Sequence, residues 1–334
     1  MPRLSLFMPG LRPVGAAAAP AALARLLARA DWQPAPQTLP RMLLTQLGLA
    51  ADAALPIGPL CALHDLALTS VDAGWCRADP VHLRADPRLV LLLAPGQGEV
   101  AVEEAVAAVA ALNAQLPECE WRVGRSPERW YVRAPDLEHS SPYGPAWLSG
   151  RSVTPFISRA PSARRWRGLF NDAQMVLHAL PLNELRAARG LTALNALWLW
   201  GSDGATAAGP RPAVAAAIGN DVLLAGAAQT AGVAWTPAAG AAELLTRLER
   251  EDLLLMLDAP WGAALPDAPL MTLETFAHEL LPALWRALGR NGFEAIELFG
   301  ETACGRLRPG GRWRFWRRAT ALAPGDCHDL PELP

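Results

Sequence analysis

The sequence predicts an α/β protein: a mainly parallel sheet with helices on both faces, interrupted by an inserted α+β subdomain. From about residue 166 onward, short apolar segments alternate with helical segments, as in parallel strands joined by helices. Residues 252–257 (DLLLML) show no alternation of polar and apolar side chains, which indicates a strand covered on both faces. Between 70 and 165 the strand-like runs are short and lie around one helix, which indicates a separate subdomain. We therefore expect a core formed by residues 1–70 and 166–334, and an insertion formed by residues 71–165.

The first part of the core begins with a buried strand. Residues 4–8 are mostly apolar, and the chain then turns at Pro9 and Gly10. Two segments rich in Ala and Leu, 17–30 and 41–50, are expected helices, and the second ends near Gly48. Within the insertion we expect strands at 89–94, 120–124 and 129–133, one helix at 99–116 and a loop at 136–166.

The second part of the core contains the clearest helical pattern. Residues 272–288 have an apolar stripe that consists of Leu273, Phe276, Leu280, Leu281, Leu284 and Leu288. Residues 194–200 form a short apolar strand that ends at a glycine turn. The remaining expected elements are helices at 171–178 and 212–231 and strands at 295–299 and 313–316.

Composition excludes several classes of function. The 334 residues are 51% hydrophobic and 19% charged with a formal net charge of −2, so the chain is globular without general attraction for nucleic acid or anionic lipid. All 30 basic residues are arginines, which excludes a Schiff-base lysine and the lysine of a Walker loop. The five cysteines are scattered and never in Cys-x-x-Cys spacing, which argues against disulfides and zinc and for a reducing compartment.

The N-terminal segment is superficially similar to a signal peptide. Pro9, Gly10 and Arg12 interrupt its apolar stretch too early for such a signal. No apolar run reaches the ~18 residues that a bilayer crossing needs. We therefore expect a cytoplasmic protein that does not associate with membranes.

Two motifs have both a functional and a structural interpretation. Gly96-x-Gly98-x-x-Ala101 follows a strand and opens a helix, as in dinucleotide-binding sites, but Glu99 would lie beside the phosphate, so a tight turn explains the motif better. Residues 311–318 (GRWRFWRR) interleave arginines with aromatics, as platforms for single-stranded nucleic acid do. The alternative, which the acidic net charge favours, is a strand whose Trp313 and Phe315 face the core.

Residues 75–86 (WCRADPVHLRAD) form a first polar cluster. They indicate either a salt-bridged strand or an anion-binding edge formed by Arg77 and Arg84. If the protein is an enzyme, Asp79 and His82 are the acid–base pair to test. None of the six histidines forms a close pair of metal ligands.

Residues 174–201 form a second polar cluster that ends in LNALWLWG. Asn183 and Arg186 lie three residues apart and therefore share one face of a helix. Asn195 lies at the entry of the strand 194–200 and is expected to tie it down. Trp198 and Trp200 alternate with leucines, so both rings lie on one side of that strand.

The second cluster also carries a family resemblance. The pattern His-x-x-Pro-x-Asn-x-x-Arg-x-x-x-Gly-x-x-x-x-Asn-x-x-Trp-x-Trp-Gly, from His178 to Gly201, resembles the junction segment of archaeal-type cofactor-independent phosphoglycerate mutases. Residues 214–240 and 251–260 are similar to the next helix and core strand of those enzymes. The segments WCRADPVHL, WRGLFNDAQMVLH and LNALWLWG together resemble the bacterial RpfE-type regulatory proteins. The resemblance implies an alkaline-phosphatase-like sheet.

The departures from the mutase pattern concern its metal ligands. Superfamily enzymes hold two metal ions with Asp and His side chains at strand ends. In this chain the first strand ends in Phe7-Met8-Pro9-Gly10 instead of Asp-Gly. Met256, Trp261 and Leu265 take the places of a His, an Asp and a second His. The last strand offers Glu297 and Glu301 without a histidine, so the resemblance implies a relative without metal or other cofactor.

We therefore expect a non-catalytic regulatory or binding protein on a mutase-like scaffold. Its expected ligand is a small anionic metabolite or a partner protein, bound in a cleft between core and subdomain. The alternatives are an active phosphoglycerate mutase or phosphatase, a metal-independent activity at the same cleft, and a nucleic-acid-associated factor. The expected ligand-binding residues are Arg77, Asp79, His82, Gln174, His178, Asn183, Arg186, Asn195, Trp198 and Trp200.

Overall fold

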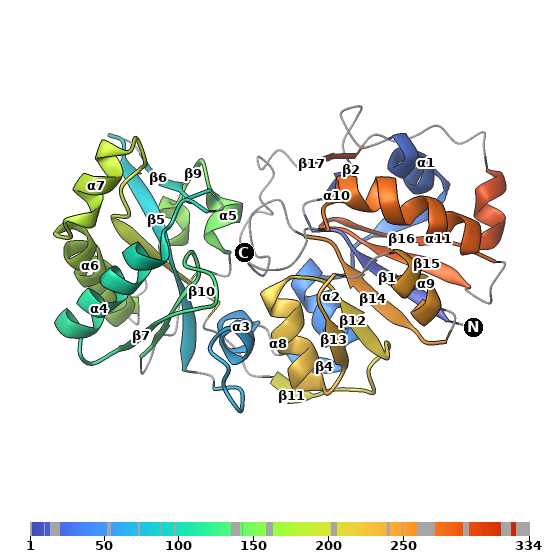
Figure 1. Cartoon of the computed structure of the whole chain (residues 1–334), viewed down its shortest axis with the longest axis horizontal. Helices are drawn as coiled ribbons and strands as arrows, with labels where there is room; N and C mark the ends of the chain where they lie inside the picture. Colours follow the sequence, from blue (N-terminus) through green and yellow to red (C-terminus); the bar gives the residue numbers. More distant parts are fainter. Residues whose placement is uncertain are drawn as a thin grey trace. The chain divides into compact units, whose positions relative to one another are not determined.

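The computed structural model divides the chain into two compact units (Figure 1). The first unit consists of Met1–Ala50 and Ala208–Pro334, and the second of Ala51–Ala207. The sequence had indicated boundaries near 70 and 165, so the second unit is longer at both ends than the expected insertion. The structure describes all residues except 1, 10, 14–20, 52–54, 73, 88, 97, 135–140, 142, 158–162, 202–205, 239–240, 249, 259–270, 290–293, 315–321 and 325–334.

A seven-stranded sheet organises the first unit, in the order β13-β12-β14-β1-β15-β16-β3. The strands β13, β12, β14, β1 and β15 are parallel, whereas β16 runs antiparallel to both of its neighbours. The mainly parallel sheet confirms the predicted fold class. The bounds are β1 (Arg3–Phe7), β3 (Asp31–Pro34), β12 (Ala216–Ile218), β13 (Ala234–Thr236), β14 (Leu253–Met256), β15 (Ala295–Phe299) and β16 (Ala303–Leu307).

Helices cover both faces of this sheet, and the alternation along β1 shows how. Leu4 and Leu6 join the apolar core beneath α1, α9 and the helix that α10 and α11 form together. Ser5 points to the opposite face, where its Oγ lies 3.4 Å from Oε1 of Gln46 in α2. The bounds are α1 (Ala21–Arg29), α2 (Leu39–Gln46), α8 (Val222–Ala231), α9 (Ala241–Leu248), α10 (Leu273–Thr275) and α11 (Leu281–Ala287).

The predicted helix at 212–231 is wrong in its first half. Residues Ala216–Ile218 form β12, and α8 begins only at Val222. The chain turns between them at Gly219, whose φ is +149°, and Asp221 then caps α8 by accepting hydrogen bonds from the N–H groups of Leu223 and Leu224. Ala and Ile in a short apolar run do not distinguish a buried strand from a helix, which explains the error.

Other differences also concern the first unit. The strands β3, β13 and β16 and the helix α9 were not predicted. The expected strand 313–316 is wrong in its described part, because Pro309–Trp313 forms a 3₁₀ turn and Trp313 is 70% exposed instead of facing the core; Phe315 and residue 316 lie outside the described residues. The predicted helix at 272–288 exists but contains a π-helical turn, Phe276–Leu280, because Pro282 has no N–H to continue the regular pattern.

An antiparallel sheet organises the second unit, in the order β7-β8-β5-β6-β9, with β10 also paired to β5. The long strand β5 pairs with β8 near its start, with β10 in the middle and with β6 near its end. The bounds are β5 (Trp75–Ala85), β6 (Val90–Leu93), β7 (Glu120–Val123), β8 (Trp130–Arg133), β9 (Arg151–Ser152) and β10 (Ala196–Trp200).

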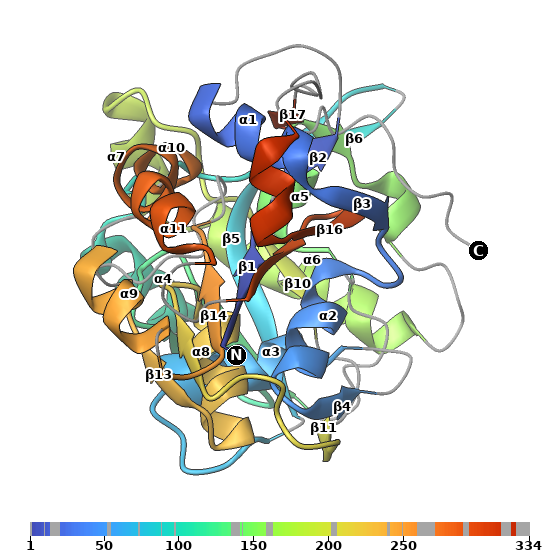
Figure 2. The same cartoon turned by 90° about the vertical axis from the view of Figure 1, so that its right-hand side faces the viewer.

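The pairing of β10 explains why the second unit extends beyond residue 165. We expected this strand to belong to the parallel core sheet, but it runs antiparallel to β5. The helix α6 packs on β10, and α3 packs on β5, so both helices join this unit. Figure 1 shows α4, α6 and α7 together on one side of the sheet of this unit, and Figure 2 gives the same chain turned by 90°. The bounds are α3 (Ile57–Asp65), α4 (Val102–Gln115), α5 (Pro145–Leu148), α6 (Arg164–His178) and α7 (Leu182–Ala188).

Two short strand pairs complete the fold. The strand β17 (Leu322–Pro324) pairs with β2 (Leu11–Pro13). The strands β4 (Leu49–Ala51) and β11 (Thr206–Ala208) pair where the chain passes from one unit to the other. Within the described part of the chain, none of the helices combines the length and the apolar character of a membrane-crossing segment.

Candidate functional site

The first predicted cluster contains a buried ion pair. The Nη2 of Arg77 donates to both carboxylate oxygens of Asp79 at 2.8 Å, and its Nε donates to Oδ1 at 3.0 Å. The indole Nε1 of Trp200 donates to Asp79 Oδ2 at 2.8 Å. The Arg77 guanidinium lies over the rings of Tyr131 and Trp200, at 5.3 and 5.1 Å from their centroids. Burial alone would lower the pKa of Arg77, but the Asp79 carboxylate outweighs it and holds this pKa well above its ordinary value.

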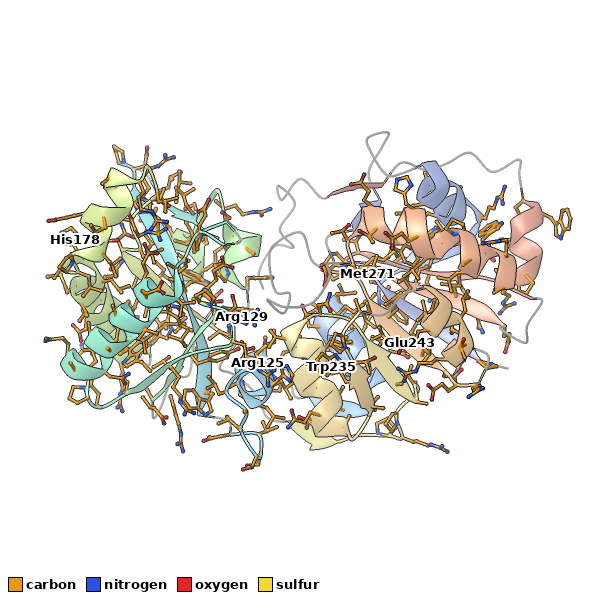
Figure 3. The ribbon with its side chains drawn as sticks, in the orientation of Figure 1. Arg125, Arg129, His178, Trp235, Glu243 and Met271 are labelled. Atoms are coloured by element: carbon orange, nitrogen blue, oxygen red, sulfur yellow. The ribbon has the colours of Figure 1, made fainter. Side chains whose placement is uncertain are left out.

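A second buried ion pair adjoins the first through Tyr131. The Nε and Nη2 of Arg129, a residue labelled in Figure 3, donate to the Asp65 carboxylate at 2.7 and 3.0 Å. The Tyr131 hydroxyl donates to Asp65 Oδ2 at 2.8 Å. Burial raises the pKa of Asp65, but the hydrogen bonds from Arg129 outweigh it, so this pKa lies below its usual value. We did not predict Asp65 or Arg129, because 63 residues separate them in the sequence. Within each pair, the charge of the arginine and the charge of the aspartate compensate each other.

His82 lies apart from this network. Its Nδ1 is 2.9 Å from the carbonyl oxygen of Ala193. Side chains three residues apart on a strand point to opposite faces, so Asp79 and His82 do not form the acid–base pair that we considered. The same alternation separates Arg77 from Arg84, and Arg77 is already paired. The anion-binding edge is therefore not formed, and the alternative, a salt-bridged strand, describes β5.

The polar residues of the second cluster tie loops to strands and helices. The Asn195 side chain accepts from Leu83 N at 2.8 Å and donates to Leu83 O at 3.0 Å, which fixes the entry of β10 as expected. Asn183 makes the same kind of double contact in α7, accepting from Leu194 N at 2.8 Å and donating to Leu177 O at 2.9 Å. These amides satisfy backbone groups that a connecting segment would otherwise leave unpaired.

Arg186 is fully buried and joins three segments. Its Nε donates to Thr192 O at 2.8 Å, and its Nη1 donates to Glu99 O at 2.9 Å and to the Glu104 carboxylate. Arg189 reaches the same carboxylate at 3.3 Å. On α6, Gln174 is half-buried and His178 is exposed (Figure 3).

The two tryptophans of LNALWLWG have different surroundings. Trp198 is fully buried, its Nε1 donates to Tyr143 O at 2.9 Å, and its ring meets Phe170 edge-on at 6.4 Å. Trp200 is half-buried and covers the Arg77–Asp79 pair. Trp198 is therefore a core residue, while Trp200 is partly exposed.

The Gly96–Ala101 segment is a turn whose backbone N–H groups donate to carboxylates of this protein. The N–H of Gly96 donates to Glu99 at 2.9 Å, that of Gly98 donates to Glu128, and that of Ala101 donates to Glu104 at 3.1 Å. These amides are the ones that a pyrophosphate would need. The structure thus supports the tight turn that we favoured over dinucleotide binding.

The carboxyl end of the parallel sheet in the first unit is mostly apolar. Phe7 at the end of β1 stacks on Phe299 at the end of β15, with ring centroids 4.5 Å apart. Met8 and Met256 are both buried. Trp261 and Leu265 lie outside the described residues. Glu297 lies within β15 and pairs with Arg3 and Arg306 at 3.8 and 3.9 Å, so it is occupied away from this end.

One carboxylate is buried at this end of the sheet. Asp258 is 9% exposed, and its Oδ2 accepts from Asn220 Nδ2 at 3.2 Å and from the N–H of Met271, which is labelled in Figure 3. Within the described part of the chain, its buried Oδ1 has no hydrogen-bond partner. Burial raises the pKa of Asp258, against the lowering effect of the Met271 and Asn220 donors. Among the described residues, no three His, Cys, Asp or Glu side chains are grouped to hold a metal ion.

Comparison with known proteins identifies similar folds but does not identify an activity. No family model matches the chain, and no curated protein matches it. The structure is similar to that of the PH0037 protein from Pyrococcus horikoshii, with a TM-score of 0.50 and 15% identity over 96% of this chain and 91% of that one. It is also similar to a cofactor-independent phosphoglycerate mutase from Thermoplasma acidophilum DSM 1728, with a TM-score of 0.42 and 17% identity over 92% and 90% of the two chains. The first likeness concerns the fold alone.

Proposed function

We propose that the protein is a non-catalytic regulatory or binding protein on an alkaline-phosphatase-like, phosphoglycerate-mutase-like scaffold. The resemblance from His178 to Gly201 and the two-unit α/β fold support this scaffold. The resemblance of WCRADPVHL and LNALWLWG to RpfE-type regulatory proteins supports the regulatory role.

The observation that carries this proposal is the character of the carboxyl end of the parallel sheet. Phe7, Met8 and Met256 stand where the resembled enzymes place carboxylates and an imidazole, and none of the three offers a ligand to a hard divalent metal ion. The buried carboxylate of Asp258 instead connects Asn220 to Met271. A two-metal phosphoryl transfer has no support from these side chains.

The ligand that we propose is a small anionic metabolite or a partner protein. Most of the ten expected binding residues are held in contacts within the second unit, so we assign ligand contact to those that reach the surface. Gln174 and His178 lie four residues apart on one face of α6, and the Trp200 ring is half-buried. The buried residues among the ten, such as Arg77 and Arg186, then stabilise the unit that carries these more exposed side chains.

Elemental analysis of the purified protein, paired with a phosphoglycerate mutase assay in the presence of Mn²⁺, tests the proposal. We expect no stoichiometric metal and no isomerisation, beside an archaeal-type mutase assayed as positive control. A screen of phosphorylated metabolites without metal should then find a ligand that raises the melting temperature by mass action. Stoichiometric Mn or Zn together with turnover would show that the protein is an enzyme and reject the proposal.

A further inference from the structure

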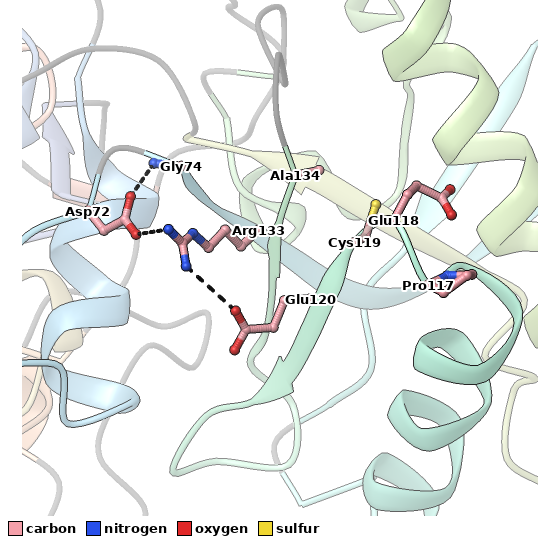
Figure 4. A pocket seen from close by; sticks show the side chains of 8 residues that line it. All are labelled: Asp72, Gly74, Pro117, Glu118, Cys119, Glu120, Arg133 and Ala134. Atoms are coloured by element: carbon pink, nitrogen blue, oxygen red, sulfur yellow. Dashed lines mark hydrogen bonds and ion pairs between the residues drawn. The ribbon is translucent and has the colours of Figure 1, made fainter.

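The second unit contains a pocket that is unrelated to the sheet end discussed above. Its volume is about 520 Å³, within the range of small-molecule sites. The pocket lies between the start of β5, the segment that follows α4, and the facing ends of β7 and β8 (Figure 4). The side chains that matter for its chemistry are those of Asp72, Glu118, Cys119, Glu120 and Arg133.

The lining of this pocket is negative. Three carboxylates stand against one guanidinium, that of Arg133. The helix α4 ends at Gln115, two residues before the lining residue Pro117, so the negative end of its dipole adds to the same field. This field favours a positively charged ligand and disfavours a phosphate.

The thiol of Cys119 gives separate evidence on whether the cation is a metal ion or an organic molecule. This side chain is 7% exposed, lines the pocket, and has no hydrogen-bond partner among the described residues. Burial, reinforced by the charge of Glu118, raises its pKa to about 11, so the thiol stays neutral at physiological pH. A neutral thiol is a poor metal ligand but a suitable contact for the aliphatic part of an organic molecule.

The guanidinium of Arg133 already pairs with two of the carboxylates that line the pocket. Its Nη2 lies 2.9 Å from Asp72 Oδ2, and its Nη1 lies 3.8 Å from Glu120 Oε2 (Figure 4). The side chain is 51% exposed, and such solvent-exposed pairs contribute little free energy. The Arg133 stem passes Gly74, where a Cβ would lie 3.5 Å from its Cγ. A ligand cation of comparable geometry can therefore compete with Arg133 for these oxygens at small cost.

We propose that this pocket binds a small organic cation, with a guanidinium or ammonium group between Asp72 and Glu120 and its aliphatic part against Cys119. Arg133 acts as an internal competitor that the ligand displaces. The site is separate from the proposed function, because none of its lining residues is among the ten expected binding residues.

Calorimetric titration of the full chain with agmatine tests this site. Agmatine carries both cationic groups on a short aliphatic chain, and N-butylurea provides a control of similar shape to its guanidinium end without the charge. We expect saturable 1:1 binding of agmatine that weakens with added NaCl, and no binding of N-butylurea. Absence of saturable agmatine binding, or equal binding of N-butylurea, would contradict the proposal.

The variant Arg133→Gln gives the most specific readout. Removal of the internal competitor should tighten agmatine binding about three- to fivefold, which corresponds to the loss of one exposed ion pair. Arg84→Gln makes the same change of charge at an exposed residue of β5 outside the pocket and should leave the affinity within about twofold. Equal tightening in both variants would show a general charge effect and reject the site.

Removal of a carboxylate that lines the pocket should have the opposite effect on the affinity for agmatine. Glu120→Gln should weaken agmatine binding about three- to fivefold, whereas Glu103→Gln, on the exposed face of α4, should not change it. Circular dichroism of each variant establishes that it is folded. Unchanged binding in folded Glu120→Gln would overturn the assignment, whatever the outcome of the mutase assay.

Discussion

Single residues differ in how well the sequence reveals their partners. Arg77 and Asp79 could be predicted to interact, because side chains two residues apart on a strand share a face. Asp65 and Arg129 could not, because their contact depends on how α3 packs against the sheet of the second unit. Asp258 is a third case. Nothing in its residue type or its spacing from other residues distinguishes it, and only its burial in the folded chain does.

The titration of Asp258 predicts a measurable dependence of stability on pH. Because burial raises its pKa in the folded chain, its contribution to stability is fully present below the unfolded pKa, about 3.9, and is lost as pH rises through the folded pKa. Asp258→Asn keeps an oxygen that accepts from Met271 and Asn220 but does not titrate. Urea unfolding between pH 4 and 8 should show wild type losing stability relative to this variant by about 1.4 kcal/mol per unit of pKa shift.

A matched control for this measurement is Asp172→Asn, which removes an exposed carboxylate from α6. Its stability should follow that of wild type at every pH. A difference between wild type and Asp258→Asn that stays constant over the range would mean that Asp258 does not titrate there.

At the scale of elements, several apolar strands and one helix were predicted, whereas other elements of similar length were not. The strands at 4–8, 89–94, 129–133, 252–257 and 295–299 and the helix at 99–116 are present within a few residues. The strands β3, β13 and β16 were missed, and β12 was taken for the start of a helix. Their residues do not alternate cleanly, because neighbouring strands and not their own sequence place them in the sheet.

The contact between α3 and β5 gives a prediction about packing. A Cβ at Gly58 would lie 2.9 Å from both Gly201 O and Trp75 O, so the helix can lie this close only with glycine there. We expect Gly58→Ala to lower the free energy of unfolding by about 1–3 kcal/mol. Chemical denaturation followed by tryptophan fluorescence measures the change.

Gly168, in the middle of α6, is the matched control because a Cβ there meets nothing within 4 Å. Gly168→Ala should stabilise the protein by about 0.5–1 kcal/mol through helix propensity alone. If Gly58→Ala is equally stabilising, the close packing of α3 on β5 is not a constraint.

At the scale of the whole molecule, the sequence predicted an α/β core with an inserted subdomain, but contact between distant segments set the limits of the two units. The second unit is one continuous stretch, Ala51–Ala207, with its own sheet, buried ion pairs and covering helices. The first unit is assembled from two separate stretches. Alternation of strands and helices continues through residue 200, so the sequence alone does not show where one sheet ends and the other begins.

This organisation predicts that residues 51–207 fold in isolation. The fragment should show a cooperative urea transition and the near-ultraviolet circular dichroism of fixed tryptophans, because Trp130, Trp166 and Trp198 are all buried within this unit. The fragment 1–50 should remain unfolded, since its central strand β1 needs β14 and β15 from beyond residue 207. A gradual, non-cooperative transition of the 51–207 fragment would mean that the units are not independent.

The pairing of β4 with β11 has a consequence for the history of the chain. Because these strands lie side by side, the second unit leaves and rejoins the first at neighbouring positions. A gene encoding the first unit could therefore gain, lose or exchange the whole intervening stretch with only a short join between residues near 50 and 208. On this view the two units could diverge under separate selection, because each has its own sheet.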